Sequence, residues 1–250
     1  PLPTSGYHFA AEAANNKLYL IKQTFNYEYD LVSWTAKVPM PTCRYAVALA
    51  TCENKIYCIT GADSSDLSAA NEVYDTVTDT WETKTPIPTP RINLNANVVN
   101  GKIYLISGAI RDPKFPDTNF YLHTNVTEVY DITTDTWTTK TSIPHAVSQY
   151  VSAVVNDKIY VIADTLTQIY DPQTDTWSYG KPLPYPVTNA CGVAVDNRIY
   201  FIGGLMRGYE TDYNQVYIPD TDSWLIGEPM PTARYGSAAA VLDNKIYVIG

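Results

Sequence analysis

The chain alternates short apolar runs with short polar turns, and one apolar run recurs six times within 250 residues. Each copy begins with Lys or Arg, continues with Ile or Leu and then Tyr, and follows a polar turn of two residues. The copies begin at Lys17, Lys55, Lys102, Lys158, Arg198 and Lys245. Self-similarity at this period indicates an array of small structural units, so the repeat itself predicts the architecture.

The second unit shows the elements that each repeat predicts. An apolar strand at 46–51 meets the turn Glu53-Asn54, and a second strand returns at 55–60. After a loop, a third strand is expected at 71–75, and Trp81 opens a fourth. Four antiparallel strands in each unit are typical of a propeller blade. The pattern therefore predicts an all-β propeller.

The turns and the tryptophans support this prediction. Apart from Glu53, the two-residue turns between first and second strands hold only Asn, Asp and Gly, and these residues best tolerate the positive φ of tight hairpins. One tryptophan recurs in each unit, and a residue repeated in every blade is usually structural. We predict that these side chains pack between neighbouring blades: Trp34, Trp81, Trp137, Trp177 and Trp224.

The proline steps between units predict the blade boundaries. Five complete four-stranded blades and half of a sixth are expected in a single domain, at residues 1–40, 41–87, 88–143, 144–183, 184–230 and, in part, 231–250. The last unit stops within its second strand, at Gly250. We therefore expect the chain to be a segment of a longer protein.

Two segments carry a family resemblance. Residues 199–204, Ile-Tyr-Phe-Ile-Gly-Gly, and Val73-Tyr74-Asp75 followed by Trp81 resemble the Kelch repeat. The resemblance covers the whole chain and implies a Kelch-type β-propeller. Its Gly-Gly doublet is complete only at Gly203-Gly204, and Tyr217-Ile218 replaces Tyr-Asp in unit five. Kelch propellers range from adaptors to enzymes, so the resemblance implies fold more specifically than function.

Charge and hydropathy exclude two classes of partner. The formal charge is −9, which disfavours binding to nucleic acid or to an anionic membrane. No apolar run approaches the roughly 20 residues that span a bilayer, so no membrane insertion is expected within this segment. The predicted partner is a protein or peptide, and a glycan is also possible.

Catalytic and metal-binding patterns are absent from the sequence. Cys43, Cys52, Cys58 and Cys191 lack zinc-ligand spacing and are expected to be buried free thiols. The three histidines lie in different units. Copper-radical Kelch oxidases need a His pair with a Cys–Tyr partnership, and the iron-dependent specifier proteins of plants use a Glu-x-x-x-Asp-x-x-x-His run. Neither pattern can be placed here. We expect no cofactor, no metal and no catalysis, with a sugar-active or metal-dependent enzyme as an alternative.

One face of the propeller is the predicted binding face. In a Kelch-like blade, the loop between the second and third strands lies beside the segment that leads into the first strand. Those loops are long in units two, three and five, where insertions are tolerated. Tyr and Arg often anchor interfaces. The candidate contacts on this face are Arg44, Tyr45, Arg91, Arg111, Phe115, Phe120, Tyr121, His123, Tyr150, Arg207, Tyr209, Tyr213, Arg234 and Tyr235.

Several alternatives stay open at this stage. The loops can instead pack on one another, and the arginines of the lead-in segments can hydrogen-bond the backbone. Asn125-Val126-Thr127 is an N-glycosylation acceptor pattern, relevant only in a secreted protein. The Thr-Asp-Thr-Trp turns resemble those of prokaryotic or archaeal cell-surface Kelch proteins, which implies an extracellular or cell-surface location. The alternative is an intracellular Kelch adaptor that binds a peptide within a larger complex.

Overall fold

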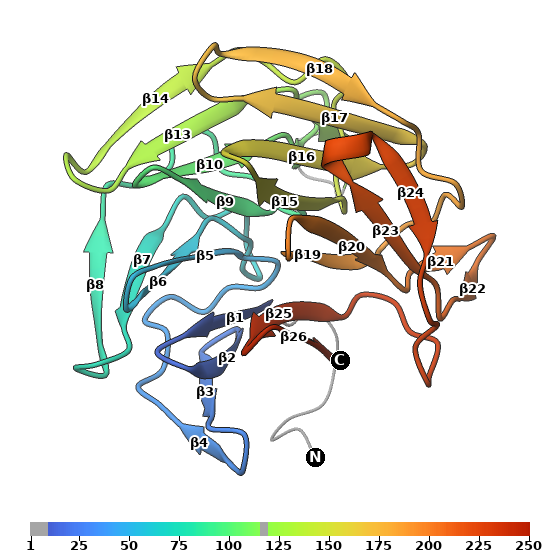
Figure 1. Cartoon of the computed structure of the whole chain (residues 1–250). Coiled ribbons are helices and arrows are strands. Elements are labelled where there is room, and N and C mark those ends of the chain that lie inside the picture. Colours follow the sequence, from blue (N-terminus) through green and yellow to red (C-terminus); the bar gives the residue numbers. More distant parts are fainter. Residues whose placement is uncertain (1–9, 116–119) are drawn as a thin grey trace.

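The computed structural model describes residues 10–115 and 120–250 and is almost entirely β-structure. Sheets stand around a central axis like the blades of a propeller (Figure 1). This arrangement confirms the predicted all-β propeller with five four-stranded blades. Residues 1–9 of the first predicted blade lie outside the described residues, and the predicted blade boundaries themselves stay a prediction.

The blades follow one another along the sequence. Blade one holds β1 (Ala10–Ala14), β2 (Lys17–Lys22), β3 (Phe25–Tyr29) and β4 (Trp34–Ala36), and blade two holds β5 (Ala48–Cys52), β6 (Lys55–Ile59), β7 (Asn71–Asp75) and β8 (Thr80–Lys84). Blade three holds β9 (Ala96–Val99), β10 (Lys102–Ile106), β13 (Thr127–Asp131) and β14 (Thr136–Lys140), and blade four holds β15 (Val151–Val155), β16 (Lys158–Ala163), β17 (Leu166–Asp171) and β18 (Thr176–Gly180).

Blade five and the last strands complete the ring. Blade five holds β19 (Cys191–Val195), β20 (Arg198–Ile202), β23 (Asn214–Ile218) and β24 (Ser223–Ile226), with a short 3-10 helix, η1 (Pro219–Thr221), before its last strand. Two small hairpins rise from the blades: β11 (Ala109–Arg111) with β12 (Tyr121–His123), and β21 (Leu205–Met206) with β22 (Tyr209–Glu210). Finally, β25 (Ala238–Leu242) pairs with β26 (Lys245–Ile249).

The innermost strands form a closed ring. Contacts run from β1 to β5, β9, β15, β19 and β25, and then back to β1. The turns between first and second strands use left-handed backbone, with φ of 49° at Asn15 and 59° at Asn16. Asn tolerates this conformation well, so the predicted turn chemistry is confirmed.

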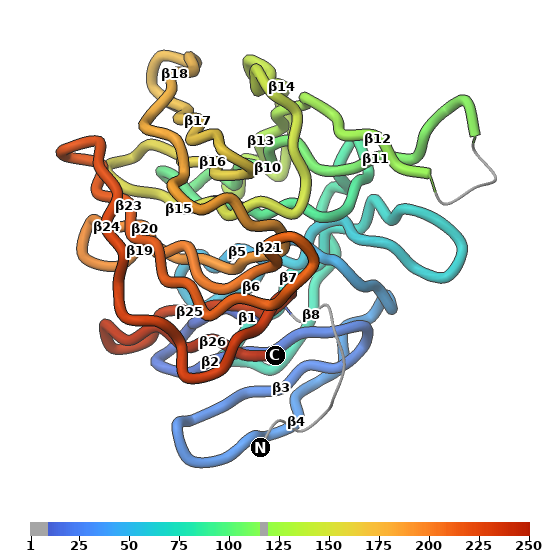
Figure 2. Tube along the Cα trace, turned by 90° about the vertical axis from the view of Figure 1, so that its right-hand side faces the viewer, coloured from blue at the N-terminus to red at the C-terminus, as the bar shows by residue number. Residues whose placement is uncertain are grey.

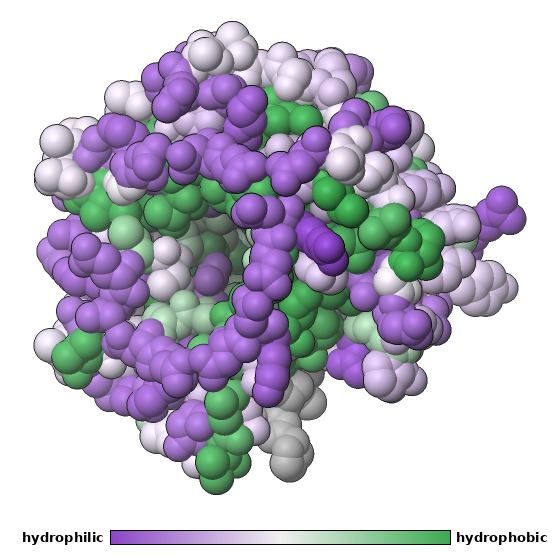
Figure 3. All heavy atoms as spheres, viewed as in Figure 1, coloured by the Kyte–Doolittle hydropathy of each residue, from purple (hydrophilic) through white to green (hydrophobic). Residues whose placement is uncertain are grey.

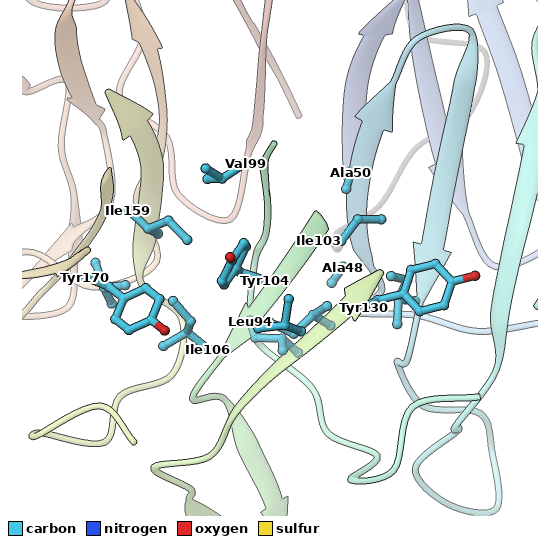
Figure 4. Packing of buried hydrophobic residues seen from close by; sticks show 14 of the residues in the cluster. Ala48, Ala50, Leu94, Val99, Ile103, Tyr104, Ile106, Tyr130, Ile159 and Tyr170 are labelled. Atoms are coloured by element: carbon cyan, nitrogen blue, oxygen red, sulfur yellow. The ribbon is translucent and has the colours of Figure 1, made fainter. Parts of the chain in front are cut away.

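The second strands are buried on both faces because blades pack face to face. In β6 all residues from Ile56 to Ile59 are buried. Figure 4 shows Ala48, Ile103 and Ile159, from three successive blades, in one apolar cluster. The repeated tyrosines meet across the blade interfaces. The ring of Tyr104 in β10 lies 5.9 Å from that of Tyr170 in the next blade.

A turn aspartate in each of blades two to five connects its blade to the preceding one. In blade three, Oδ1 of Asp135 accepts hydrogen bonds from the Tyr130 hydroxyl at 2.6 Å and from the Thr85 N–H at 2.9 Å. The Trp137 ring N–H donates to the Thr85 carbonyl at 2.9 Å. The same set recurs at Asp79 with Val38, Asp175 with Thr141, and Asp222 with Lys181.

This Tyr–Asp–Trp clasp gives the tryptophans their role. Each of the four tryptophan side chains is half-buried and bonds the preceding blade, which refines the predicted packing between blades. The Tyr130 hydroxyl is the leading cause that holds the pKa of Asp135 below its usual value. The aspartate is therefore charged near neutral pH, and charge-assisted hydrogen bonds are stronger than neutral ones.

Replacing the clasp aspartate tests its contribution to stability. Asp135→Ala removes the shared acceptor and leaves the buried Tyr130 hydroxyl unpaired, so we expect the free energy of unfolding to fall by roughly 1–3 kcal/mol. Urea denaturation measures the change. Asp135→Asn is the matched control, because its side-chain oxygen still accepts and Asn tolerates the local φ of 54°. Unchanged stability in the Ala variant would contradict the role of the clasp.

Candidate binding face

The loop face is the end of the propeller formed by the loops between second and third strands and by the lead-in segments of the first strands. Bridges join the two kinds of segment, such as Tyr45 with Ala62 and Ile92 with Ala109. The β11–β12 hairpin projects furthest from the body of the propeller in Figure 2. Blades one and four turn in two residues, as expected, and leave their part of the face low.

Two of the candidate contacts, Arg44 and Arg91, are fully buried, with 0% of each side chain exposed. Arg44 donates to Glu72 at 2.6 Å and to the carbonyl of Thr60 at 2.6 Å. Arg91 pairs in the same way with Glu128. A buried charge needs a partner and hydrogen bonds. The third strand supplies the glutamate partner, and main-chain carbonyls in and just after the second strand supply further hydrogen bonds. The predicted role of Arg44 and Arg91 as partner contacts is thereby corrected, because they bond the backbone inside their blades.

Tyr150 is a third candidate that the structure buries. Its hydroxyl donates to the carbonyl of Ile106, and burial raises the pKa of Tyr150 to about 12. It therefore fixes the first strand of blade four against blade three and offers a partner little surface. The remaining lead-in candidates are at least partly accessible: Tyr45, Arg234 and Tyr235.

The β11–β12 hairpin is tied to the neighbouring loop of blade two. The Nε of Arg111 donates to Asp66 at 2.5 Å, and the guanidinium lies 5.7 Å from the centre of the Tyr121 ring. The hydrogen bond from Arg111 is the main cause that lowers the pKa of Asp66. Arg111 and Tyr121 therefore shape the loop face by holding its hairpin in place.

Aromatic side chains are exposed at the tip of this hairpin. Phe115 is 53% exposed and Phe120 66%, with ring centroids 6.0 Å apart. Leu122 is exposed beside them, and His123 bonds Ser148 of blade four at 3.1 Å. Exposed apolar side chains that cluster often mark an interaction site.

The β21–β22 hairpin of blade five carries the other candidates. Tyr209 is 79% exposed at its tip, and Arg207 is exposed in its turn, with a φ of 53°. Tyr213 follows the hairpin in the sequence, and its ring lies 5.5 Å from that of Tyr185. The structure thus brings together two subsets of candidates, one on each hairpin, with blade four between them.

The structure places the other candidate chemistry as follows. Asn125, the predicted glycosylation acceptor, is exposed at the base of the β11–β12 hairpin. The cysteines are free thiols, and Cys58 and Cys191 are buried as predicted. The predicted burial is wrong for Cys43, which is exposed, and for Cys52, which is half-buried. Within residues 10–115 and 120–250, no group of three or more His, Cys, Asp or Glu side chains is arranged to hold a metal. No helix in the described part of the chain has the length and apolar character that crossing a membrane requires.

A central cavity of about 410 Å³ lies inside the ring of innermost strands. Figure 3 shows the hollow in the same view as Figure 1. Glu12 is the one charged side chain that lines it among the described residues. Thr51 donates to Glu12 at 3.2 Å, and burial raises the pKa of Glu12 from its ordinary value of 4.5 to about 7. The Glu12 side chain is partly exposed to the hollow, although the surrounding protein shields it from bulk solvent.

A second cavity, of about 400 Å³, adjoins the first at the loop face. Asn93, Gln149 and Asn189 line it. Sequence reasoning missed Asn93, Asn189 and Glu12. The sequence feature that could have identified the amide residues is their equivalent position in successive lead-in segments. Glu12 has no counterpart in the other first strands and gave no repeat signal.

The segments that match a known family model coincide with two of the blades. The family model for the Kelch motif matches residues 43–88 and 186–231, which contain the strands of blades two and five. The chain carries Kelch motifs. Together with the propeller fold, these matches are consistent with the Kelch-repeat family, whose propellers commonly mediate protein binding or act as enzymes.

A solved structure shares the architecture of this propeller. The structure of YjhT superposes with a TM-score of 0.85 at 15% sequence identity, over 99% of this chain and 91% of that chain. At this identity the similarity shows the fold alone. No curated protein matches the sequence.

Removing one buried arginine tests how the lead-in segments are held. Arg91→Ala leaves Glu128 buried and unpaired, so we expect a loss of about 3–5 kcal/mol in the free energy of unfolding. Chemical denaturation measures it. Arg111→Ala is the matched control, because its ion pair with Asp66 lies at the surface, where such pairs contribute about 1 kcal/mol or less. Equal losses in the two variants would contradict this assignment.

The raised pKa of Glu12 predicts how stability changes with pH. The folded protein holds the Glu12 proton more tightly than the unfolded chain does, so stability falls as pH rises from 4.5 to about 7. Glu12→Gln removes this term, and its melting temperature at pH 8 should exceed the parent's, by about 2–4 °C for each kcal/mol recovered. Glu53→Gln, in an exposed turn, controls for the change in net charge. A parent and a Glu12→Gln variant with parallel pH profiles would contradict the assignment.

Proposed function

We propose that this propeller is a non-catalytic recognition module that binds a protein or peptide partner through its loop face. The observation that carries the proposal is the exposure of Phe115, Phe120 and Tyr209 at the tips of the two hairpins. Aromatic side chains supply large contact areas at interfaces and are enriched among the residues that dominate binding energy.

The shape of the loop face supports the same function. Blade four turns in two residues at Asp164 and Thr165, between the taller hairpins of blades three and five. A recess of about 300 Å³ lies at the side of blade five, lined by Asp164, Val187 and Arg207 among others. A low strip between two aromatic walls suits an extended peptide. Arg207 at the rim suits an acidic group on that peptide.

The blade-three hairpin is held to its neighbours and can act as a preformed surface. The Arg111–Asp66 ion pair and the bond between His123 and Ser148 fix the blade-three hairpin to both neighbouring blades. A surface that is already ordered loses little conformational freedom on binding. The partner therefore meets anchors that are in place before contact.

The absence of catalysis is part of the proposal. Motif reasoning gave no nucleophile or metal set, and the channel carboxylate, Glu12, has no second carboxylate beside it among the described cavity residues. An extracellular or cell-surface location is also proposed, on the resemblance of the turns. The exposed Asn125 would accept a glycan there. An intracellular adaptor would use the same face on a cytosolic peptide.

Selection from a library of displayed linear peptides tests the binding face. The chain is immobilised, and the affinity of each recovered peptide is measured for the parent, for Phe120→Ser with Tyr209→Ser, and for Val77→Ser with Leu225→Ser. The first pair removes loop-face anchors. The control pair removes equally exposed apolar side chains from a turn and an outer strand away from that face.

We expect the loop-face pair to weaken recovered peptides at least tenfold and the control pair to leave them unchanged. Both pairs should keep the parent's melting temperature, because all four side chains are exposed. Peptides that bind the loop-face pair as tightly as the parent would contradict the proposal.

A further inference from the structure

One position in each lead-in segment that the structure describes has left-handed backbone. In blades two to five it is Ala46, Asn93, Gln149 and Asn189, with φ between 52° and 58°, and before β25 it is Gly236, with φ of 63°. The recurrence shows that the propeller requires this conformation at the rim of the axis, whatever the residue. Blades three, four and five place a carboxamide there, whereas the other two positions carry Ala and Gly.

The main chain at this rim is already hydrogen-bonded from blade to blade. The N–H of Gln149 donates to the carbonyl of Asn93 at 2.9 Å, and the N–H of Gly236 donates to that of Asn189 at 2.9 Å. The rim is therefore a fixed frame. The side chains at these positions are therefore held at defined places around the axis, where a ligand can contact them.

The three carboxamides make no side-chain hydrogen bond with the rest of the described chain. All three line the same cavity of about 400 Å³. A neighbouring amide behaves differently: Asn95 donates its side-chain N–H to the carbonyl of Tyr150 at 2.9 Å. The rim amides thus keep both a donor and an acceptor for a ligand.

Charge narrows the class of ligand. Among the described residues, no charged side chain lines the rim cavity. The adjoining channel holds Glu12, and the whole chain carries a formal charge of −9. These charges disfavour an anion. A cation would find no charged partner at the rim, so the site suits a neutral polar molecule.

We propose that this rim cavity, with the Asn93, Gln149 and Asn189 carboxamides, binds a small neutral polyhydroxylated molecule of monosaccharide size. Each hydroxyl of such a molecule is a donor and an acceptor, which matches a carboxamide. Its hydroxyls also spread around a ring, as the three amides spread around an axis. A peptide backbone presents its polar groups along a line, which suits a strand edge. The volume lies within the usual range for small-molecule sites.

Titration with neutral hexoses tests the proposal. The probes are D-glucose, D-galactose and D-mannose, each also as its methyl glycoside, and the readout is the set of side-chain amide signals in ¹⁵N NMR spectra. Loss of signals in the single glycine variants assigns the amides of Asn93, Gln149 and Asn189. We expect saturable shifts of these amides with at least one probe.

The variants separate the contribution of the side-chain amides to binding from that of the backbone. Asn93→Gly, Gln149→Gly and Asn189→Gly together remove the carboxamides and keep the left-handed conformation, as Gly236 already does at its own position. We expect this triple variant to bind the hexose at least tenfold more weakly. Asn197→Gly, in a left-handed turn at the opposite end of the blade, is the matched control and should bind as the parent does.

Each outcome of the titration supports or overturns the proposal. A methyl glycoside that binds as well as the free hexose identifies the end of a glycan as the source, whereas binding of the free hexose alone identifies a free sugar. No saturable shift with any hexose overturns the proposal, as does a triple variant that binds within twofold of the parent. Shifts caused only by a neutral amide probe, N-acetylglycine methylamide, would also overturn it. The parent titration keeps the test valid if the triple variant folds poorly.

Discussion

The hydrogen bonds of the Tyr–Asp–Trp clasp connect each of blades two to five to its predecessor, and the rest of the structure depends on them. A blade alone exposes an apolar face on each side, so blades are stable only when packed in sequence. The clasp at Asp79, Asp135, Asp175 and Asp222 fixes how neighbouring blades meet, because one carboxylate bonds a buried tyrosine and the backbone of the blade before it. The innermost strands can then close around a hollow axis.

The loop face is free to vary because its supports lie below it. Arg44 and Arg91 bond third-strand glutamates and main-chain carbonyls inside their blades, so the lead-in segments stay in place whatever the loops above them carry. The long loops of blades three and five use this freedom to raise hairpins tipped with aromatic side chains. At the rim of the axis the variation is of another kind, because the backbone conformation is fixed and only the side chain differs from blade to blade.

The fold could be predicted from the sequence because its determinants recur. The Lys-Ile-Tyr strands, the Asn and Asp turns and the tryptophan of each unit repeat along the chain, and each has a local physical reason. The candidate site could be predicted only as a face. Arginine and tyrosine are residue types that bind partners and also residue types that fill blade interiors, and only packing separates Arg44, Arg91 and Tyr150 from the exposed Tyr209.

Other features of the site had no signal in the repeat. Glu12 lies in a strand whose counterparts hold no acidic residue, and its environment depends on the ring closing around it. The roles of Asn93 and Asn189 follow from a left-handed backbone and a shared cavity, which depend on how the lead-in segments meet at the axis. Such properties arise between blades, whereas sequence patterns describe one blade at a time.

Hydrogen exchange measured residue by residue by NMR tests the clasp most directly. The N–H groups of Val38, Thr85, Thr141 and Lys181 lie in surface segments between blades, where exchange would ordinarily be fast. Each donates to the aspartate of the following blade. If the clasp holds the propeller together, these four amides should exchange as slowly as those of the outer strands beside them, through opening of the blade interface. Exchange at the rate of ordinary exposed turns would show that the blades are held together without it.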